Sequence, residues 1–136
     1  MKKYLKLPFI VLVTFIAFSC NNSKPSKTVT QNGEINRVTP QDFNSKLDDN
    51  ILIDIRTPRE FEQGHLEGAV NVNYFDKAFL TQMAKYDKSK AIFIYCRSGS
   101  RTSSASKKLA NAGFTLIYDL HGGISNWHKN KFKIVK

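Results

Sequence analysis

The chain has 136 residues, of which 41% are hydrophobic and 24% are charged, a composition that fits one globular domain and excludes wholesale disorder. Its two cysteines are too few for a disulfide framework or a cysteine-rich zinc site. The formal net charge is +10, but five of the 21 lysines and arginines precede Glu34, and every acidic residue lies at or after it. The charge therefore does not require a nucleic acid partner, and we expect none.

Residues 1–19 have the pattern of a signal peptide. Three lysines in the first six residues precede the apolar run LPFIVLVTFIAF, which is shorter than the ~20 residues that a membrane-spanning helix needs. The run leads into AFSC, which resembles the lipobox of bacterial lipoproteins, in which the cysteine, here Cys20, becomes the lipidated N-terminus. The alternative is an uncleaved hydrophobic anchor, with Cys20 incidental.

Residues 20–33 are rich in Asn, Ser, Thr and Lys, and because nothing in them could bury a core we expect a flexible tether. The signal peptide and the tether together predict a protein that is lipid-anchored in the bacterial cell envelope and faces the periplasm or the exterior. The folded domain then comprises residues 34–136.

Strand and helix patterns alternate along residues 34–136. We predict strands over residues 35–38, 51–55, 91–95 and 115–120, with a further short apolar stretch over residues 69–72. Helices are predicted after the N-cap residues Thr39 and Thr57, over residues 75–86 and 102–112, and after residues 122–123. This alternation predicts an α/β domain in which helices surround a central, mostly parallel sheet.

Cys96 gives the clearest chemical signal. It directly follows the most apolar strand, and in parallel sheets ligands bind beyond the carboxyl ends of the strands. The free N–H groups of the next helix, together with Arg97 and Arg101, would stabilise a thiolate there, and the loop would form a nest for an anion. Such a thiol is a nucleophile for anionic substrates. The alternative is a buried, inert cysteine, which fits poorly beside two arginines.

Three separated segments resemble the rhodanese-type sulfurtransferases. CRSGSR, residues 96–101, looks like the active-site loop of that family. LIDIRTPREFEQGHLEGAVNVNY, residues 52–74, looks like its amino-terminal signature, and GFTLIYDLHGGISNW, residues 113–127, looks like its carboxyl-terminal signature. The resemblance covers nearly all of the folded part and implies a rhodanese-like three-layer domain in its single-domain form.

The resemblance also implies roles for individual residues. Cys96 matches the cysteine that accepts sulfane sulfur as a persulfide, and Arg101 is expected near an anionic donor such as thiosulfate. Asp54 and Arg56 match architectural positions: Asp54 is expected to accept hydrogen bonds from nearby backbone, and Arg56 is expected to pair with Glu60 or another acid. The residues expected to surround the persulfide and its donor are Arg97, Ser98, Gly99, Ser100, Arg101 and Thr102.

His65 has two interpretations, a partner of Cys96 in a Cys–His dyad or a hydrogen-bonded structural residue. The chemistry that the resemblance implies relies on the loop dipoles and needs no general base, so we favour the structural role. His121 and His128 have no partners at metal-ligand spacing, so we expect neither a metal site nor a cofactor.

A cysteine phosphatase is the nearest rival in loop chemistry. Such an enzyme needs Cys-x5-Arg, so that seven loop residues wrap a tetrahedral phosphate and the last of them clamps it. Here the sixth loop residue is Arg101 and the seventh is Thr102, so we favour sulfur over phosphorus. If Cys20 is lipidated, Cys96 has no cysteine partner, which excludes an oxidoreductase of the Cys-x-x-Cys type.

We therefore expect a sulfurtransferase that moves sulfane sulfur from thiosulfate or a persulfide, through a Cys96 persulfide, to a thiophilic acceptor. Cyanide, glutathione or a protein thiol would serve as the acceptor. The alternative is a non-enzymatic sulfur carrier or protein-interaction module at the membrane surface. No self-pairing segment is visible in the sequence, so a monomer is expected.

Overall fold

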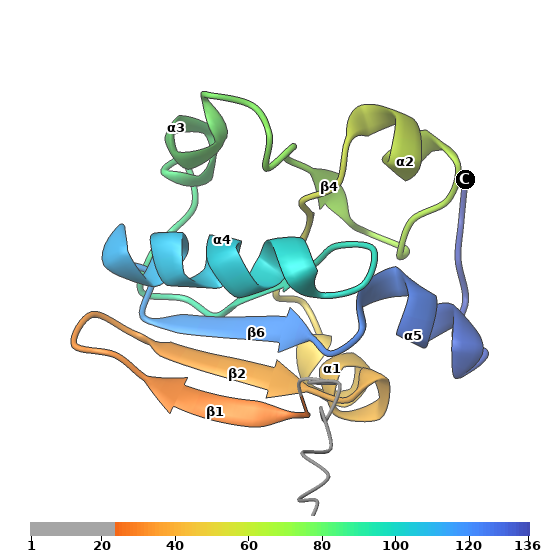
Figure 1. The fold of residues 1–136 in the computed structure, drawn as a ribbon, viewed down its shortest axis with the longest axis horizontal. Coiled ribbons are helices and arrows are strands. Elements are labelled where there is room, and N and C mark those ends of the chain that lie inside the picture. Colours follow the sequence, from red (N-terminus) through yellow and green to blue (C-terminus); the bar gives the residue numbers. More distant parts are fainter. Residues whose placement is uncertain (1–23) are drawn as a thin grey trace, which may run out of the picture.

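The computed structural model describes residues 24–136, and the predicted signal peptide and Cys20 lie outside this part of the chain. Over the described residues the chain forms one six-stranded sheet covered by helices (Figure 1). No helix within them is long and apolar enough to cross a membrane.

The strands follow the order β1-β2-β6-β5-β3-β4 across the sheet. Their bounds are β1 Ser26–Val29, β2 Glu34–Val38, β3 Ile51–Asp54, β4 Val70–Asn71, β5 Ile92–Tyr95 and β6 Leu116–Leu120. Among these strands only β1 is antiparallel to its neighbour, and the other pairs are parallel. The prediction of a mostly parallel sheet is confirmed, and each strand predicted from an apolar run is present.

Strand β1 corrects the prediction of a flexible tether over residues 20–33, because it lies within that segment. Its backbone pairs with β2, with Ser26 opposite Arg37 and Val29 opposite Glu34. All four side chains of β1 are exposed, so the segment buries no apolar face. Backbone hydrogen bonds and an ion pair between Lys27 and Glu34, with Nζ 3.0 Å from Oε2, hold it in the sheet, and apolar periodicity cannot reveal such a strand.

Five helices connect the strands. Their bounds are α1 Pro40–Leu47, α2 Pro58–Glu62, α3 Phe79–Met83, α4 Ser100–Asn111 and α5 Gly123–Lys129. The predicted N-caps are confirmed, since the Thr39 hydroxyl accepts a helix N–H and Thr57 forms a capping box with Glu60. Helix α3 is shorter than predicted because Asp76 accepts the Ala78 N–H in a turn before it.

Alternate residues of the central strands face opposite sides of the sheet and build two cores. On one face, Ile53 and Ile94 pack beneath α3 and α4, and on the other, Leu52 and Phe93 pack beneath α1 and α5 (Figure 1). The result is the predicted three-layer arrangement. Parallel strands β3, β5 and β6 all end at one edge of the sheet, and the loops that follow them carry the candidate site.

Candidate active site

The loop between β5 and α4 makes a sharp turn around the sulfur of Cys96. Gly99 has a φ of 95°, in the left-handed region that glycine adopts without strain, and its N–H donates to Cys96 Sγ at 3.1 Å. Helix α4 begins at Ser100, earlier than predicted, so Arg101 and Thr102 belong to its first turn. The sulfur therefore lies at the N-terminal end of a helix, where N–H groups and the helix dipole favour negative charge.

Cys96 is fully buried, whereas its neighbours Arg97 and Ser98 are exposed. Thr102 is also fully buried, and its hydroxyl lies 3.8 Å from Sγ while donating to the Gly99 carbonyl at 3.1 Å. The sulfur thus contacts an amide and a hydroxyl in addition to the hydrophobic core. This setting differs from that of an inert cysteine packed only against hydrocarbon.

The N-terminal end of α5 holds the backbone of the same loop. The N–H groups of Ile124 and Ser125 donate to the carbonyl oxygens of Cys96 and Arg97 at 2.9 and 3.1 Å. A Cβ on Gly123 would lie 2.4 Å from the Cys96 oxygen, too close for any side chain. Gly123 therefore allows α5 to approach the Cys96 loop, a role that was not predicted from the sequence, where residues 122–123 were placed only before the last helix.

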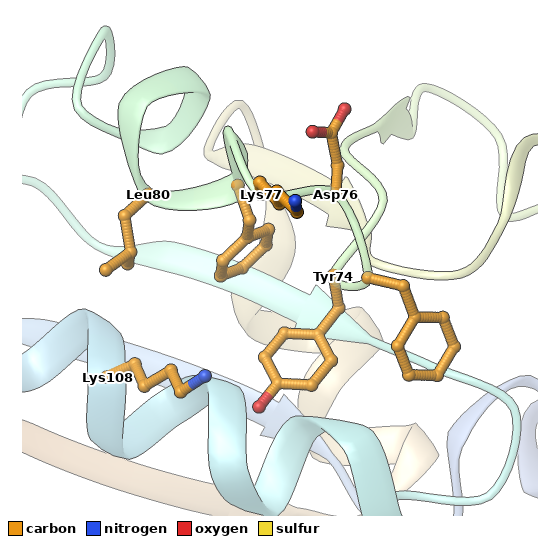
Figure 2. A pocket seen from close by; sticks show the side chains of 7 residues that line it. Tyr74, Asp76, Lys77, Leu80 and Lys108 are labelled. Atoms are coloured by element: carbon orange, nitrogen blue, oxygen red, sulfur yellow. The ribbon is translucent and has the colours of Figure 1, made fainter.

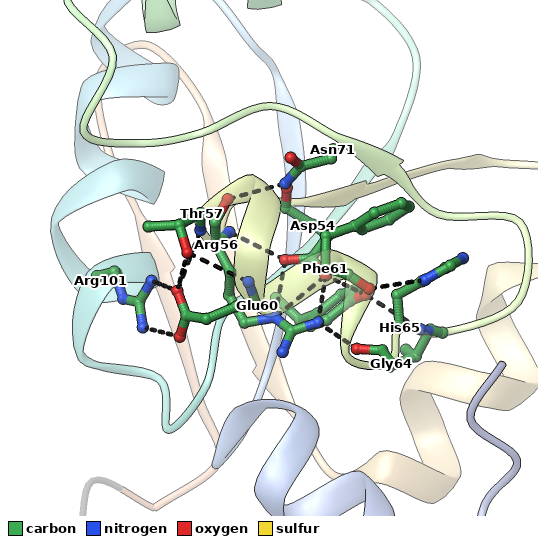
Figure 3. A network of polar contacts seen from close by, with 11 residues as sticks. Asp54, Arg56, Thr57, Glu60, Phe61, Gly64, His65, Asn71 and Arg101 are labelled. Carbon is green, nitrogen blue, oxygen red and sulfur yellow. Dashed lines mark hydrogen bonds and ion pairs between the residues drawn. The ribbon is translucent and has the colours of Figure 1, made fainter. Parts of the chain in front are cut away.

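Arg101 is held by a carboxylate in this structure. Its two terminal nitrogens donate to the two carboxylate oxygens of Glu60 at 2.8 and 2.7 Å (Figure 3). These hydrogen bonds lower the pKa of Glu60 to about 2 and raise the pKa of Arg101. From the sequence, Arg101 was expected near an anionic donor and Glu60 was a possible partner of Arg56; in the structure Arg101 and Glu60 pair with each other.

Asp54, at the end of β3, gathers hydrogen bonds on both oxygens (Figure 3). Oδ1 accepts the backbone N–H of Arg56 at 2.9 Å, and Oδ2 accepts Arg56 Nη2 at 2.7 Å and the Tyr95 hydroxyl at 2.6 Å. Arg56 Nη2 also donates to the Gly64 carbonyl at 2.6 Å. The predicted backbone hydrogen bond to Asp54 is present, and Asp54 is the acid that pairs with Arg56.

The side chain of His65 contacts Phe61, four residues before it. Its Nδ1 lies 3.1 Å from the Phe61 carbonyl oxygen, and its ring stacks on the Phe61 ring with the centroids 3.8 Å apart. Its backbone pairs with that of Val135 near the C-terminus. These contacts favour the structural role over a dyad with Cys96.

A buried ion pair behind the loop was not anticipated from the sequence. Asp119, on β6, is fully buried, and its Oδ2 accepts Arg37 Nε at 2.9 Å. Arg37 Nη2 donates to the Ser103 hydroxyl at 2.6 Å. Burial raises the pKa of Asp119, whose Oδ1 has no hydrogen-bond partner within the described residues. The alternation in β6 was the available signal, because it places Asp119 on the same face as the buried Ile117.

The groups around Sγ support nucleophilic chemistry at sulfur. The Gly99 N–H stabilises negative charge on sulfur, whereas the Thr102 hydroxyl donates its one proton to the Gly99 carbonyl, and neither is a general base. No group of three His, Cys, Asp or Glu side chains within residues 24–136 is arranged to hold a metal ion. The site therefore offers a thiol whose sulfur accepts a backbone hydrogen bond at the N-terminal end of a helix.

Known proteins are similar to this chain in sequence and in fold. Residues 39–130 match the family model of the rhodanese-like domain. The chain is 41% identical over 88 residues to thiosulfate sulfurtransferase 16, chloroplastic, of Arabidopsis thaliana, which covers 57% of this chain and 73% of the relative. It is 31% identical over 104 residues to a sulfurtransferase of Allochromatium vinosum, which covers 74% of this chain and 95% of the relative.

A solved structure gives the same result for the fold. The crystal structure of a rhodanese-related protein from Thermoplasma volcanium superposes with a TM-score of 0.66 at 21% identity, covering 73% of this chain and 96% of that one. At this identity the likeness is one of fold, and it confirms the predicted α/β class.

Proposed function

The chain belongs to the rhodanese-like domain family, and we propose that it transfers sulfane sulfur from thiosulfate or a persulfide to a thiophilic acceptor through a persulfide on Cys96. The observation that carries the proposal is the Gly99 N–H, which donates to Cys96 Sγ at 3.1 Å at the N-terminal end of α4. A thiolate or persulfide anion gains from this hydrogen bond and from the helix dipole. The sulfurtransferases among the relatives support the same reaction class.

The reaction consists of two displacements at sulfur. The Cys96 thiolate attacks the sulfane sulfur of thiosulfate, the new S–S bond forms as the S–S bond of thiosulfate breaks, and sulfite leaves with the electron pair. An acceptor such as cyanide then attacks the outer sulfur of the persulfide and leaves as thiocyanate, which restores the thiolate. Neither step needs an external oxidant, reductant or general base.

The loop favours sulfur over a phosphate ester. Because Cys96 is fully buried, a donor reaches Sγ only through an opening of the surrounding loop, and a slender chain ending in sulfur needs the smaller opening. A phosphatase would also need a free arginine to clamp the phosphate. Arg101 already forms a bidentate ion pair with Glu60, and the negative charge of Glu60 would repel a phosphate dianion.

Thiosulfate:cyanide sulfur transfer by the full chain tests the proposal. We expect the wild type to form thiocyanate, and Cys96→Ala to fall to the uncatalysed rate because it lacks the nucleophile. Ser104→Ala, an exposed position on the same helix, is the matched control and should retain the wild-type rate. A wild type inactive with both thiosulfate and persulfide donors would contradict the proposal.

Intact-mass spectrometry separates the enzyme from the alternative of a carrier or interaction module. After treatment with thiosulfate, the enzyme should gain the mass of one sulfur atom on Cys96, and repeated additions of cyanide or thiol should remove it with turnover. An adduct that forms without turnover indicates a sulfur carrier. Absence of any adduct indicates an interaction module.

We also propose that a lipid on Cys20 anchors the domain in the bacterial cell envelope. The support is the sequence pattern of three early lysines, a short apolar run and AFSC. Cys20→Ala should leave the membrane fraction for the soluble fraction, and the wild-type N-terminus should carry a diacylglyceryl mass. Retention of Cys20→Ala in the membrane fraction would indicate an uncleaved anchor instead.

A further inference from the structure

A cavity of about 400 Å³ opens between the segment after β4 and helix α4 (Figure 2). Tyr74, Phe75, Lys77, Leu80 and Lys108 are among the residues in its wall. The volume lies at the small end of the range for small-molecule sites. Phe75 is 65% exposed and Leu80 is 42% exposed, so the cavity offers apolar surface that the fold itself does not use.

The cavity also offers two ammonium groups without a carboxylate partner in the described part of the chain. Lys77 is exposed, and Lys108 Nζ lies 5.0 Å from the centroid of the Tyr74 ring. The acidic residue in the wall, Asp76, is engaged by its own segment, since its oxygens accept the Ala78 N–H at 2.8 Å and a nearby side-chain amide at 3.2 Å. The cavity therefore favours a ligand with a negative group and an apolar stem.

The cavity adjoins the Cys96 loop through Phe75. The guanidinium carbon of Arg101, in the first turn of α4, lies 5.4 Å from the Phe75 ring centroid. Lys108 is two turns further along the same helix, about 10 Å away by the helix rise. Since Glu60 compensates the charge of Arg101, a carboxylate in the cavity would pair with the ammonium group of Lys108 at this distance, while Arg97 is exposed on the Cys96 loop itself.

We propose that this cavity binds the carboxylate and the apolar stem of an extended organic thiol whose sulfur reacts at Cys96. The inference rests on the sulfurtransferase function proposed above and adds a substrate class to it, a carboxylated thiol whose stem covers the span of about 10 Å along α4 from Arg101 to Lys108. The carboxylate pairs with Lys77 and Lys108, and the stem lies against Phe75 and Leu80. The thiolate of this acceptor attacks the outer sulfur of the Cys96 persulfide, which yields an organic persulfide and the Cys96 thiolate.

Sulfur transfer from the thiosulfate-loaded full chain to three thiols tests the inference. Mercaptooctanoate is long and charged, mercaptooctanol is long and neutral, and mercaptopropionate is short and charged. We expect kcat/KM to be highest for mercaptooctanoate, and the double variant Lys77→Gln/Lys108→Gln to lose about three- to tenfold with this thiol alone, as the loss of two exposed ion pairs implies. The rate of sulfur transfer from the double variant to cyanide should equal that of the wild type.

Lys107→Gln is the matched control, because this lysine is exposed on the same helix but lies outside the cavity wall. It should keep the preference for mercaptooctanoate. An equal loss for mercaptooctanoate and mercaptooctanol in the double variant, or an unchanged preference, would overturn the inference.

A binding experiment keeps this inference distinct from the proposed function. Cys96→Ser cannot transfer sulfur, but S-methylated mercaptooctanoate should still shift the amide NMR signals of residues 74–80 and 108. Shifts there support the cavity as a site even if no donor is turned over, and their absence overturns the inference. A wild type that transfers no sulfur to cyanide counts against the proposed function alone.

Discussion

Asp54 and Asp119 are both fully buried near the carboxyl ends of parallel strands, but their surroundings differ. Both oxygens of Asp54 are occupied, by the backbone and guanidinium of Arg56 and by the Tyr95 hydroxyl. Asp119 accepts from Arg37 through one oxygen, and its other oxygen has no partner among the described residues. Burial accordingly raises the pKa of Asp119.

The difference shows when a buried carboxylate stabilises a fold. Removing a carboxylate from water costs several kcal/mol, and only hydrogen bonds to both oxygens offset that cost. Asp54 achieves this with the guanidinium of Arg56, two residues away in sequence. The same guanidinium donates to the Gly64 carbonyl and so fixes the segment after α2. Asp119 depends on one partner 82 residues away. We therefore expect the fold to depend strongly on Asp54 and weakly on Asp119.

Asp54→Asn should have the largest effect, a loss of about 3–5 kcal/mol in the free energy of unfolding. The amide would face donors from Arg56 and Tyr95 and would leave a buried guanidinium without its charge partner. Urea unfolding followed by the fluorescence of Trp127, the single tryptophan, measures the change. Asp49→Asn, at an exposed position, is the control, and an equal loss in both variants would contradict the expectation.

Tyr95→Phe should have an intermediate effect, about 1–3 kcal/mol. Burial raises the pKa of Tyr95, so its hydroxyl stays protonated and donates to Asp54 at 2.6 Å while accepting the Leu66 N–H at 3.0 Å. Removing the hydroxyl keeps the ring packing but leaves the Leu66 amide without its partner. The same unfolding measurement on Tyr118→Phe, a tyrosine on the neighbouring strand, should show a smaller loss. Equal losses would mean that the Asp54 cluster does not depend on this hydroxyl.

The two aspartates also show how far the sequence determines the fold. Apolar runs identified β3, β5 and β6, and Thr39 and Thr57 identified two helix starts, because these signals depend on neighbouring residues. The Asp54–Arg56 pair spans two residues and was within reach of the same reasoning. Strand β1 was not, because its side chains are exposed and it pairs with β2 through backbone hydrogen bonds and the Lys27–Glu34 ion pair.

The candidate site likewise has features that the sequence predicts and features that it does not. Cys96 and its loop were predicted because a motif and a strand end coincide in the sequence. The pairing of Arg101 with Glu60, 41 residues apart, and the close approach of Gly123 to the Cys96 carbonyl depend on how separate elements pack. No local pattern records such contacts, so they became visible only in three dimensions.

Asp119→Asn should have the smallest effect, within about 1 kcal/mol, because losing the pair with Arg37 is offset by removing a poorly solvated charge. How this change in stability depends on pH shows whether Asp119 differs from Asp54 as expected. Since the pKa of Asp119 is raised in the folded state, the folded chain holds this proton more tightly than the unfolded chain. The wild type therefore loses stability from this group as pH rises from the ordinary value of 3.8 through the raised pKa.

The amide introduced by Asp119→Asn does not titrate, so relative to the wild type this variant should gain stability as pH rises through that window. Urea unfolding of both chains at a series of pH values from 3.8 upward measures the difference. Glu60 contributes in the opposite direction, since its pKa of about 2 means that its stabilisation is lost as pH falls below 4.5, but it is common to both chains and cancels. A difference that moves against the variant as pH rises would show that the ion pair with Arg37 outweighs burial, and Asp119 would then stabilise the fold as Asp54 does.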